Sequence, residues 1–120
     1  MTLDDDTPIL DDAVLAELRE STGGDDDFVR ELVDAYVSEA IGYLEAMTAA
    51  VADPEAIVRP AHTLKSSSAT LGAMRLAAIS RGIEEAGRAG RADGLAADVE
   101  HAHQAWTETL AALTAAGLAS

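Results

Sequence analysis

The sequence has 120 residues, which is the size of one ordinary domain, and its lack of cysteine excludes a disulfide framework, a thiolate metal site and a cysteine nucleophile. The net charge of −14 disfavours nucleic acid and anionic membranes as partners, and no apolar run approaches the roughly 20 residues that cross a bilayer. Acidic residues follow Met1 where a secretory leader would be basic and then apolar. We therefore expect one domain over residues 1–120 with a flexible start at 1–8, a cytoplasmic location, no nucleic acid partner and no membrane insertion.

Apolar residues recur at helical spacing in five segments, and no segment alternates as a strand does. The first helix is predicted over Asp11–Glu20, and the breakers after it separate it from a long second helix over Asp27–Val51. The second helix carries a broad apolar stripe, which is typical of a helix packed in a bundle. The stripe consists of Phe28, Val29, Leu32, Val33, Ala35, Tyr36, Val37, Ala40, Tyr43, Leu44 and Met47.

The pair Asp53-Pro54 resembles a helix N-cap followed by proline at the first helical position. It predicts a third helix that ends near Leu71. Pro60 lies inside this helix, where proline removes a backbone hydrogen bond and clashes with the preceding turn. We therefore expect a kink there, or a break with a new helix starting near Arg59.

A fourth helix is predicted over Met74–Arg88 and a fifth over Leu95–Ala116, with a glycine-rich segment between them. Helices of these lengths with short connections indicate an all-α fold. We expect an antiparallel four-helix bundle with a short additional N-terminal helix.

The middle of the chain is locally basic within an acidic protein. Six of the eight basic residues lie between residues 59 and 91, where only Glu84 and Glu85 are acidic. The six are Arg59, Lys65, Arg75, Arg81, Arg88 and Arg91. Local positive charge suits a site that handles a phosphoryl group, although alanine-rich helices also carry arginine simply as part of a solvated face.

Helical spacing places His62, Lys65, Ser66 and Ala69 on one face of the third helix. An exposed histidine can act as a neutral nitrogen nucleophile at cellular pH. A lysine one turn away can donate charge-assisted hydrogen bonds to an oxyanion, and small residues leave room for another surface. These are the parts that a phosphohistidine site needs.

At these residues the sequence resembles a known family, the histidine-containing phosphotransfer (Hpt) domains. The run from His62 to Ala73 matches the Hpt signature of a histidine, an apolar residue two positions on, a lysine three on, a small residue four on and a glycine ten on. The segment 81–88 is similar to the helix that follows in this family. Two positions depart from the pattern: Ser66 stands where the family most often has glycine, and Pro60 precedes the histidine by two residues.

The resemblance implies a phosphorelay intermediate of two-component signalling. His62 would accept a phosphoryl group from a receiver aspartate or a sensor histidine kinase and pass it to a response-regulator receiver. Lys65 matches the family lysine that neutralises the phosphoryl group, and Glu84 stands where the family often has a residue that orients the imidazole. Such a protein is a carrier and not an enzyme in its own right.

The same resemblance implies that the chain binds no metal and no cofactor, with Mg²⁺ expected on the partner receiver. The predicted partner-binding residues are Ser66, Ala69 and Gly72, although Gly72 also suits close helix packing or a helix end. We expect a monomer. His101 and His103, two positions apart on a helix, point to different sides and are poor metal ligands.

Three other hypotheses remain open. The chain can be a helical module that docks a receiver or kinase without phosphotransfer, although the intact pair of His62 and Lys65 argues against it. It can be the phosphoryl-accepting domain of a larger kinase, which the start at Met1 disfavours. It can be an enzyme that uses His62 as a general base, for which the sequence shows no supporting constellation.

Overall fold

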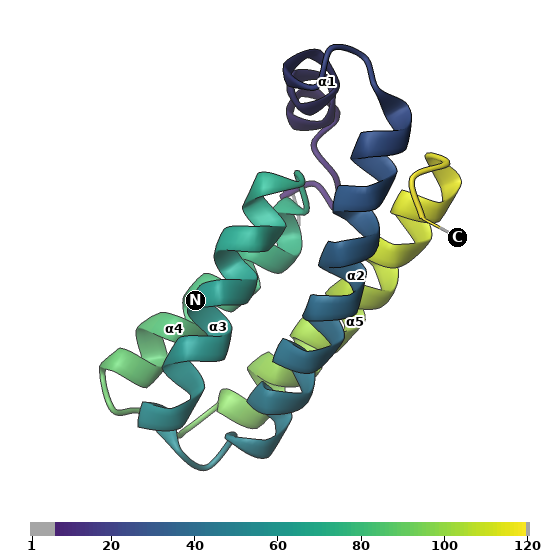
Figure 1. The fold of residues 1–120 in the computed structure, drawn as a ribbon. Helices are drawn as coiled ribbons and strands as arrows, with labels where there is room; N and C mark the ends of the chain where they lie inside the picture. Colours follow the sequence, from purple (N-terminus) through teal and green to yellow (C-terminus); the bar gives the residue numbers. More distant parts are fainter. Residues whose placement is uncertain (1–6, 120) are drawn as a thin grey trace.

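The computed structural model describes residues 7–119 and contains five helices and no strand within that range (Figure 1). The helices are α1 (Asp12–Ser21), α2 (Asp26–Ala49), α3 (Pro54–Thr70), α4 (Met74–Arg88) and α5 (Leu95–Ala115). The all-helical prediction is confirmed, and each helix begins and ends close to its predicted bounds. No helix in the described part of the chain has both the length and the hydrophobicity needed to cross a membrane.

Aspartate side chains begin three of the helices. The carboxylates of Asp11, Asp25 and Asp53 accept hydrogen bonds of 2.9, 3.1 and 3.2 Å from backbone N–H groups in the first turns of α1, α2 and α3. Each cap satisfies a donor that has no partner within its helix, which is typically worth about 1 kcal/mol. The predicted cap at Asp53 is among them.

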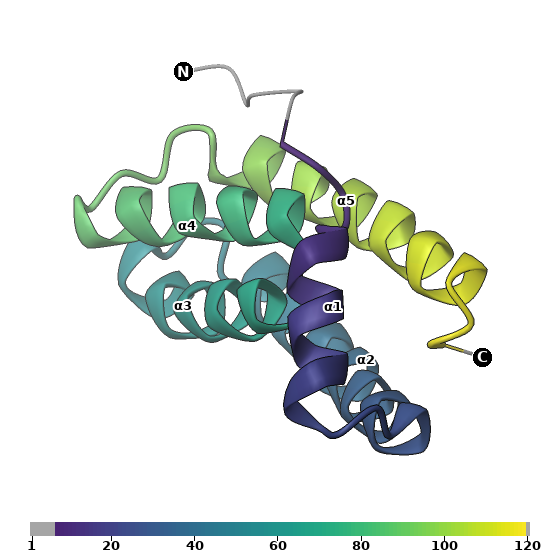
Figure 2. The same ribbon diagram turned by 90° about the horizontal axis from the view of Figure 1, so that it is seen from above.

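The four long helices each pack against two others and enclose one core. Helix α3 packs against α2 and α4, and α5 packs against the same two helices from the other side. Val, Leu, Ile and Ala side chains fill most of the core, and the rings of Tyr36 and Trp106 meet edge to face with centroids 5.6 Å apart. The shorter α1 lies across one end of the long helices (Figure 2).

The buried face of α2 is narrower than the predicted stripe. Phe28 and Leu32 are exposed, with 46% and 36% of their surfaces accessible, and Ala35 is exposed as well. The buried residues of this helix are Val29, Val33, Tyr36, Ala40, Leu44 and Met47. The predicted burial was wrong for Phe28, Leu32 and Ala35. Apolar side chains on adjacent faces of a helix look alike in sequence, and the neighbouring helices decide which face is covered.

Helix α3 runs through Pro60 without a break, so the predicted second start near Arg59 is wrong. Proline has no N–H to donate to the carbonyl of Ala56, one turn earlier. Ala56 is exposed, while Pro60 is buried. Burial of the apolar ring offsets part of the cost of the missing hydrogen bond.

Gly72 joins α1 to the turn between α3 and α4. Its φ of +80° is a backbone conformation that favours glycine, and its carbonyl accepts a hydrogen bond of 2.8 Å from the N–H of Asp11. A Cβ at this position would lie 3.1 Å from the Asp11 carbonyl oxygen and 3.3 Å from the Cβ of Val14. Glycine is therefore needed here for the approach of α1.

Arg75 holds the chain that leads into α1. Its backbone N–H donates to the carbonyl of Pro8 at 3.0 Å, and its Nε donates to the carbonyl of Thr7 at 3.0 Å. Residues 7 and 8 of the predicted flexible start are thus hydrogen-bonded to the first turn of α4. Residues 1–6 of that predicted segment lie outside the described residues, and so does residue 120.

Candidate functional site

Helices α3 and α4 approach each other closely enough for side chains of one to reach those of the other. A Cβ on Gly87 would lie only 2.7 Å from the carbonyl oxygen of Pro54 and 2.8 Å from Cγ2 of Val58, so only glycine fits this contact. One turn before it, α4 directs Glu84 toward α3. The close contact thus brings a carboxylate of one helix beside His62 and Lys65 of the other.

The carboxylate of Glu84 is the centre of the site, with only 7% of its side chain exposed. Its Oε2 atom accepts a hydrogen bond of 2.9 Å from Nδ1 of His62. The same atom accepts hydrogen bonds of 3.0 and 2.8 Å from Nε and Nη2 of Arg88. Its Oε1 atom forms an ion pair of 2.8 Å with Nζ of Lys65. Both oxygens of one buried carboxylate are therefore occupied by three side chains.

These contacts lower the pKa of Glu84 from 4.5 to about 2. The hydrogen bond from Lys65 is the largest cause, burial opposes it, and the hydrogen bonds from Arg88 and His62 reinforce it. Glu84 is consequently ionised at neutral pH and can only accept hydrogen bonds. The proton in its contact with His62 must therefore reside on Nδ1 of the imidazole.

A neutral imidazole with its proton on Nδ1 carries its lone pair on Nε2. The side chain of His62 is 54% exposed, so a reacting group can approach the ring from solvent. The arrangement is that of a nucleophile whose tautomer is fixed by a carboxylate behind it. Lys65, with 32% of its side chain exposed, lies beside the same carboxylate and provides positive charge next to the ring.

Of the predicted partner-binding residues, two are accessible and one is not. Ser66 is exposed and Ala69 is partly exposed on the helix that carries His62. Gly72 is buried against α1, so the prediction that it contacts a partner is wrong, and its alternative role in helix packing is the one that the structure has.

Hydroxyl groups on α3 are bound to their own helix. Thr63, Ser67 and Thr70 each donate a hydrogen bond of 3.0 to 3.1 Å to the carbonyl four residues earlier. Such local hydrogen bonds turn the hydrogen of each hydroxyl group away from solvent. These three residues therefore present their carbon atoms and oxygen lone pairs to the surface.

Arg88 was not among the sequence-based site residues. It lies in the locally basic segment and four positions after Glu84, a spacing at which opposite charges on a helix meet. Its importance appears only when α4 packs on α3, because the same carboxylate then also binds His62. Sequence spacing within one helix gives the pair but not the cluster.

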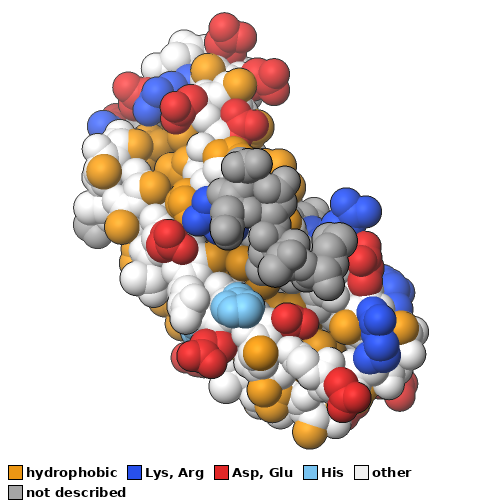
Figure 3. Space-filling model, turned by 180° about the vertical axis from the view of Figure 1, so that it is seen from behind, with side chains coloured by type: hydrophobic (Ala, Val, Ile, Leu, Met, Phe, Trp, Pro, Cys, Tyr) orange, Lys and Arg blue, Asp and Glu red, His pale blue; other side chains and the backbone are white. Residues whose placement is uncertain are grey.

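The locally basic segment of the sequence maps to α3, α4 and the loop after α4. Helix α4 and this loop carry Arg81, Arg88 and Arg91, all exposed. Figure 3, which views the molecule from behind, shows several Lys and Arg side chains along the edge where α4 lies, while acidic side chains are spread over the whole face. Positive charge is thus concentrated on the helices that form the site.

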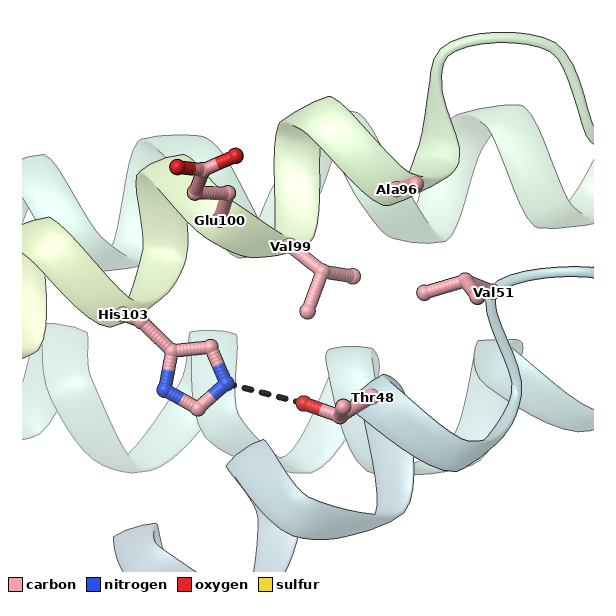
Figure 4. Close-up of a pocket in the computed structure, with 6 residues that line it drawn as sticks. All are labelled: Thr48, Val51, Ala96, Val99, Glu100 and His103. Atoms are coloured by element: carbon pink, nitrogen blue, oxygen red, sulfur yellow. Dashed lines mark hydrogen bonds between the residues drawn. The ribbon is translucent and has the colours of Figure 1, made fainter.

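A second polar contact lies in a shallow hollow between the end of α2 and the start of α5 (Figure 4). The hydroxyl of Thr48 donates to the Leu44 carbonyl at 2.9 Å, so it accepts the hydrogen bond of 2.8 Å from Nε2 of His103. The other lining residues of the hollow are Val51, Ala96, Val99 and Glu100. Within residues 7–119 no group of three potential ligands could hold a metal ion, at this hollow or elsewhere.

Comparisons with known proteins identify the family of this chain. The model of the Hpt domain family matches residues 31–116. Among solved structures, the chain is similar to the crystal structure of histidine-containing phosphotransfer protein B (HptB) from Pseudomonas aeruginosa PAO1, with 31% sequence identity, a TM-score of 0.78, and coverage of 85% of this chain and 88% of that one. No curated protein matches the chain. The residues in the family match include both helices of the site.

Proposed function

This chain belongs to the Hpt domain family and is a phosphorelay intermediate of two-component signalling, and we propose that His62 is the residue that carries the phosphoryl group. The observation that supports this proposal is the hydrogen bond from Nδ1 of His62 to the ionised Glu84. It leaves a lone pair on Nε2 of an exposed ring. An orienting carboxylate behind a solvent-facing nucleophile is the arrangement that in-line attack on phosphorus requires.

The transfer forms one bond and breaks one. The lone pair of Nε2 forms the bond to phosphorus while the bond between phosphorus and the carboxylate oxygen of the donor aspartate breaks, and that aspartate leaves as a free carboxylate. The ring keeps its proton on Nδ1 and becomes positively charged. Glu84, already bound to that proton, stabilises the developing charge without moving. Onward transfer to a second receiver reverses these events.

Lys65 supplies positive charge for the transferred group. Its amine lies 2.8 Å from Oε1 of Glu84, the carboxylate that His62 also contacts. The phosphoryl group carries about two negative charges, and an ammonium group beside it offers charge-assisted hydrogen bonds. We propose that this chain binds no cofactor of its own and that Mg²⁺ belongs to the partner receiver.

Hpt proteins are phosphocarriers rather than classical enzymes, and they work with receiver domains and kinases. For this chain we propose that a response-regulator receiver and a sensor histidine kinase dock on the exposed face of α3 around His62, with Ser66 and Ala69 allowing close approach. The contact should be modest in area because a carrier must exchange partners. We also propose that the protein acts as a monomer in the cytoplasm.

We infer that the chain is a single domain and that α2 to α5 form an antiparallel four-helix bundle with α1 added at one end. The helices connect through short loops and each packs against the next, which supports the inference. Such a bundle keeps α3 and α4 at a fixed separation, and the distance between His62 and Glu84 depends on that separation.

The test is phosphoryl transfer from a labelled kinase and receiver of the same organism to the native protein, to His62→Gln and to His103→Gln. Acid-labile, base-stable label on the native protein and on His103→Gln, but not on His62→Gln, is the expected result. Label on all three proteins would place the acceptor elsewhere. Label on none, with all three folded and several donors tried, would favour a docking module that does not accept phosphoryl groups.

A further inference from the structure

The two oxygens of Glu84 are bound unequally. Oε1 pairs with Lys65, whereas Oε2 accepts two hydrogen bonds from Arg88 and one from His62. If the amine of Lys65 leaves, the carboxylate still has a cation and three donated hydrogen bonds. If Arg88 were absent and Lys65 left, a carboxylate that is only 7% exposed would keep a single contact, the hydrogen bond from His62, which is costly.

Phosphorylation of His62 places a second anionic group near Lys65. The new group adds about two negative charges and three acceptor oxygens at Nε2 of a ring whose Nδ1 already contacts the ionised Glu84. A lysine amine is a compact charge on a flexible stem with three rotatable donors, so it can change acceptors easily. Arg88 instead donates from two guanidinium nitrogens to the same oxygen and is fixed by that geometry.

We propose that Arg88 is a positioning residue that holds Glu84 in place while Lys65 moves from Glu84 to the phosphoryl group on His62. Lys65 thus pairs with Glu84 in the resting protein and leaves it on phosphorylation. Arg88 lowers the energetic cost of this change because it keeps the carboxylate paired with a cation. The inference rests on the proposed role of His62 and extends it to a residue outside the motif.

The chain offers a direct probe of this movement, because Lys65 is the only lysine in the sequence. Protein labelled with ¹⁵N-lysine therefore gives a single side-chain amine signal in NMR spectra. Phosphoramidate, a small phosphoryl donor, can load His62 without a partner protein, so the result does not depend on docking. The native protein is compared with Arg88→Ala, Arg88→Lys and the control Arg81→Ala.

Arg81 is a matched control because it is an exposed arginine on the same helix that pairs with Glu85 and not with Glu84. In the native protein and in Arg81→Ala, phosphorylation is expected to shift the amine signal of Lys65. In Arg88→Ala the shift is expected to be mostly lost and phosphoryl uptake to slow about tenfold, the effect of one charge-assisted interaction. Arg88→Lys restores a cation but adds a second lysine amine, so it is compared by phosphoryl uptake alone, and it should recover part of that rate.

A second readout separates positioning from a general loss of structure. Nitrogen-15 shifts of the resting His62 ring should report the Nδ1–H tautomer in the native protein and a mixture of tautomers in Arg88→Ala, with unchanged helical circular dichroism. An equal lysine shift in Arg88→Ala and the native protein would overturn the role of Arg88. An unmoved lysine signal in fully phosphorylated native protein would overturn the movement. Failure of native His62 to take up phosphoryl would instead refute the proposed function itself.

Discussion

The hydroxyl groups of Tyr36 and Ser68 lie 2.7 Å apart in the core and join α2 to the buried side of the helix that carries His62. Ser68 is completely buried and Tyr36 nearly so, with 0% and 4% of their surfaces exposed. Neither hydroxyl can turn to water for a substitute partner. The pair therefore fixes the position of α3 relative to α2 with a polar contact inside an otherwise apolar core.

Ser68→Ala should destabilise the protein by about 1–3 kcal/mol, because it leaves the Tyr36 hydroxyl buried without its partner. Urea denaturation of the native protein and the variant measures this change. The double variant Tyr36→Phe/Ser68→Ala removes both polar groups and should be less destabilised than the sum of the two single variants. Additive effects would show that the two hydroxyls do not interact energetically.

Alkaline conditions should weaken the fold through Tyr36. Burial is the largest influence on its pKa and raises it from 10.0 to about 12, while the Ser68 hydrogen bond opposes this rise. The unfolded chain can then release the proton at a lower pH than the folded protein can. Stability from this group is complete below pH 10 and is lost as pH rises from 10 toward 12.

The alkaline effect is measured as the change in urea midpoint between pH 9 and pH 11.5. Tyr36→Phe should show a smaller decrease than the native protein, because phenylalanine has no proton to release. Tyr43→Phe, on the same helix but only partly buried, is the control and should keep the native decrease. Identical decreases in Tyr36→Phe and the native protein would contradict the prediction.

Acid should weaken the fold through Glu84. Its pKa is lowered from 4.5 to about 2 in the folded protein, so the folded state binds its proton less readily than the unfolded state. The stabilisation is therefore present above pH 4.5 and is lost as pH falls toward 2. The sequence has 22 acidic residues, so the useful quantity is the difference between the native protein and Glu84→Gln.

We expect the native protein to be more stable than Glu84→Gln at pH 6 and the difference to shrink steadily below pH 4.5. Glutamine keeps an acceptor for His62 but has no charge for Lys65 and Arg88. Glu85→Gln, an exposed acid on the same helix, serves as the control and should show little pH-dependent difference. A constant difference between native protein and Glu84→Gln from pH 6 to pH 3 would exclude this role.

Gly87→Ala should push α3 and α4 apart. The added Cβ would lie 2.7 Å from a backbone oxygen of Pro54, which cannot rotate away. Overpacking of this kind typically costs about 1–3 kcal/mol. Because the contact sets the separation of the two helices, the hydrogen bond between His62 and Glu84 should lengthen as well, and ring nitrogen shifts should show a mixture of tautomers.

Gly82→Ala is the matched control on the same helix, where a Cβ would meet nothing within 4 Å. It should stabilise the protein by about 0.5–1 kcal/mol through helix propensity and leave the ring of His62 unchanged. Thermal denaturation and the ring shifts of both variants decide the matter. Equal tolerance of alanine at the two positions would show that the helices can separate without cost.

Local features of the fold were predictable from the sequence. The cap at Asp53 and the shared face of His62 and Lys65 each involve residues only three or four positions apart. Helical geometry alone therefore determines both features. Phe28 was assigned to the core in error because its burial depends on which neighbouring helix lies beside it. The continuity of α3 through Pro60 goes with burial of the proline ring against neighbouring helices, which the sequence does not reveal.

The candidate site was predictable only in part because it depends on contacts between helices, which local sequence does not determine. Glu84 entered through the resemblance to Hpt domains, since 22 positions separate it from His62 and no periodicity links them. Arg88 was missed because the sequence indicates its pairing with Glu84 but not the contacts of Glu84 with His62 and Lys65. A cluster built across two helices becomes evident only when their separation is known, and here Gly87 sets that separation.

The hydrogen bonds of Thr63, Ser67 and Thr70 to their own helix bear on the lifetime of a complex formed on this face. Each hydroxyl has already given its hydrogen to the backbone of α3. A protein that covers them displaces water without having to supply an acceptor for each one, and it loses no acceptor when it departs. The face beside His62 is thus suited to short-lived complexes with more than one partner protein, as a carrier between two proteins requires.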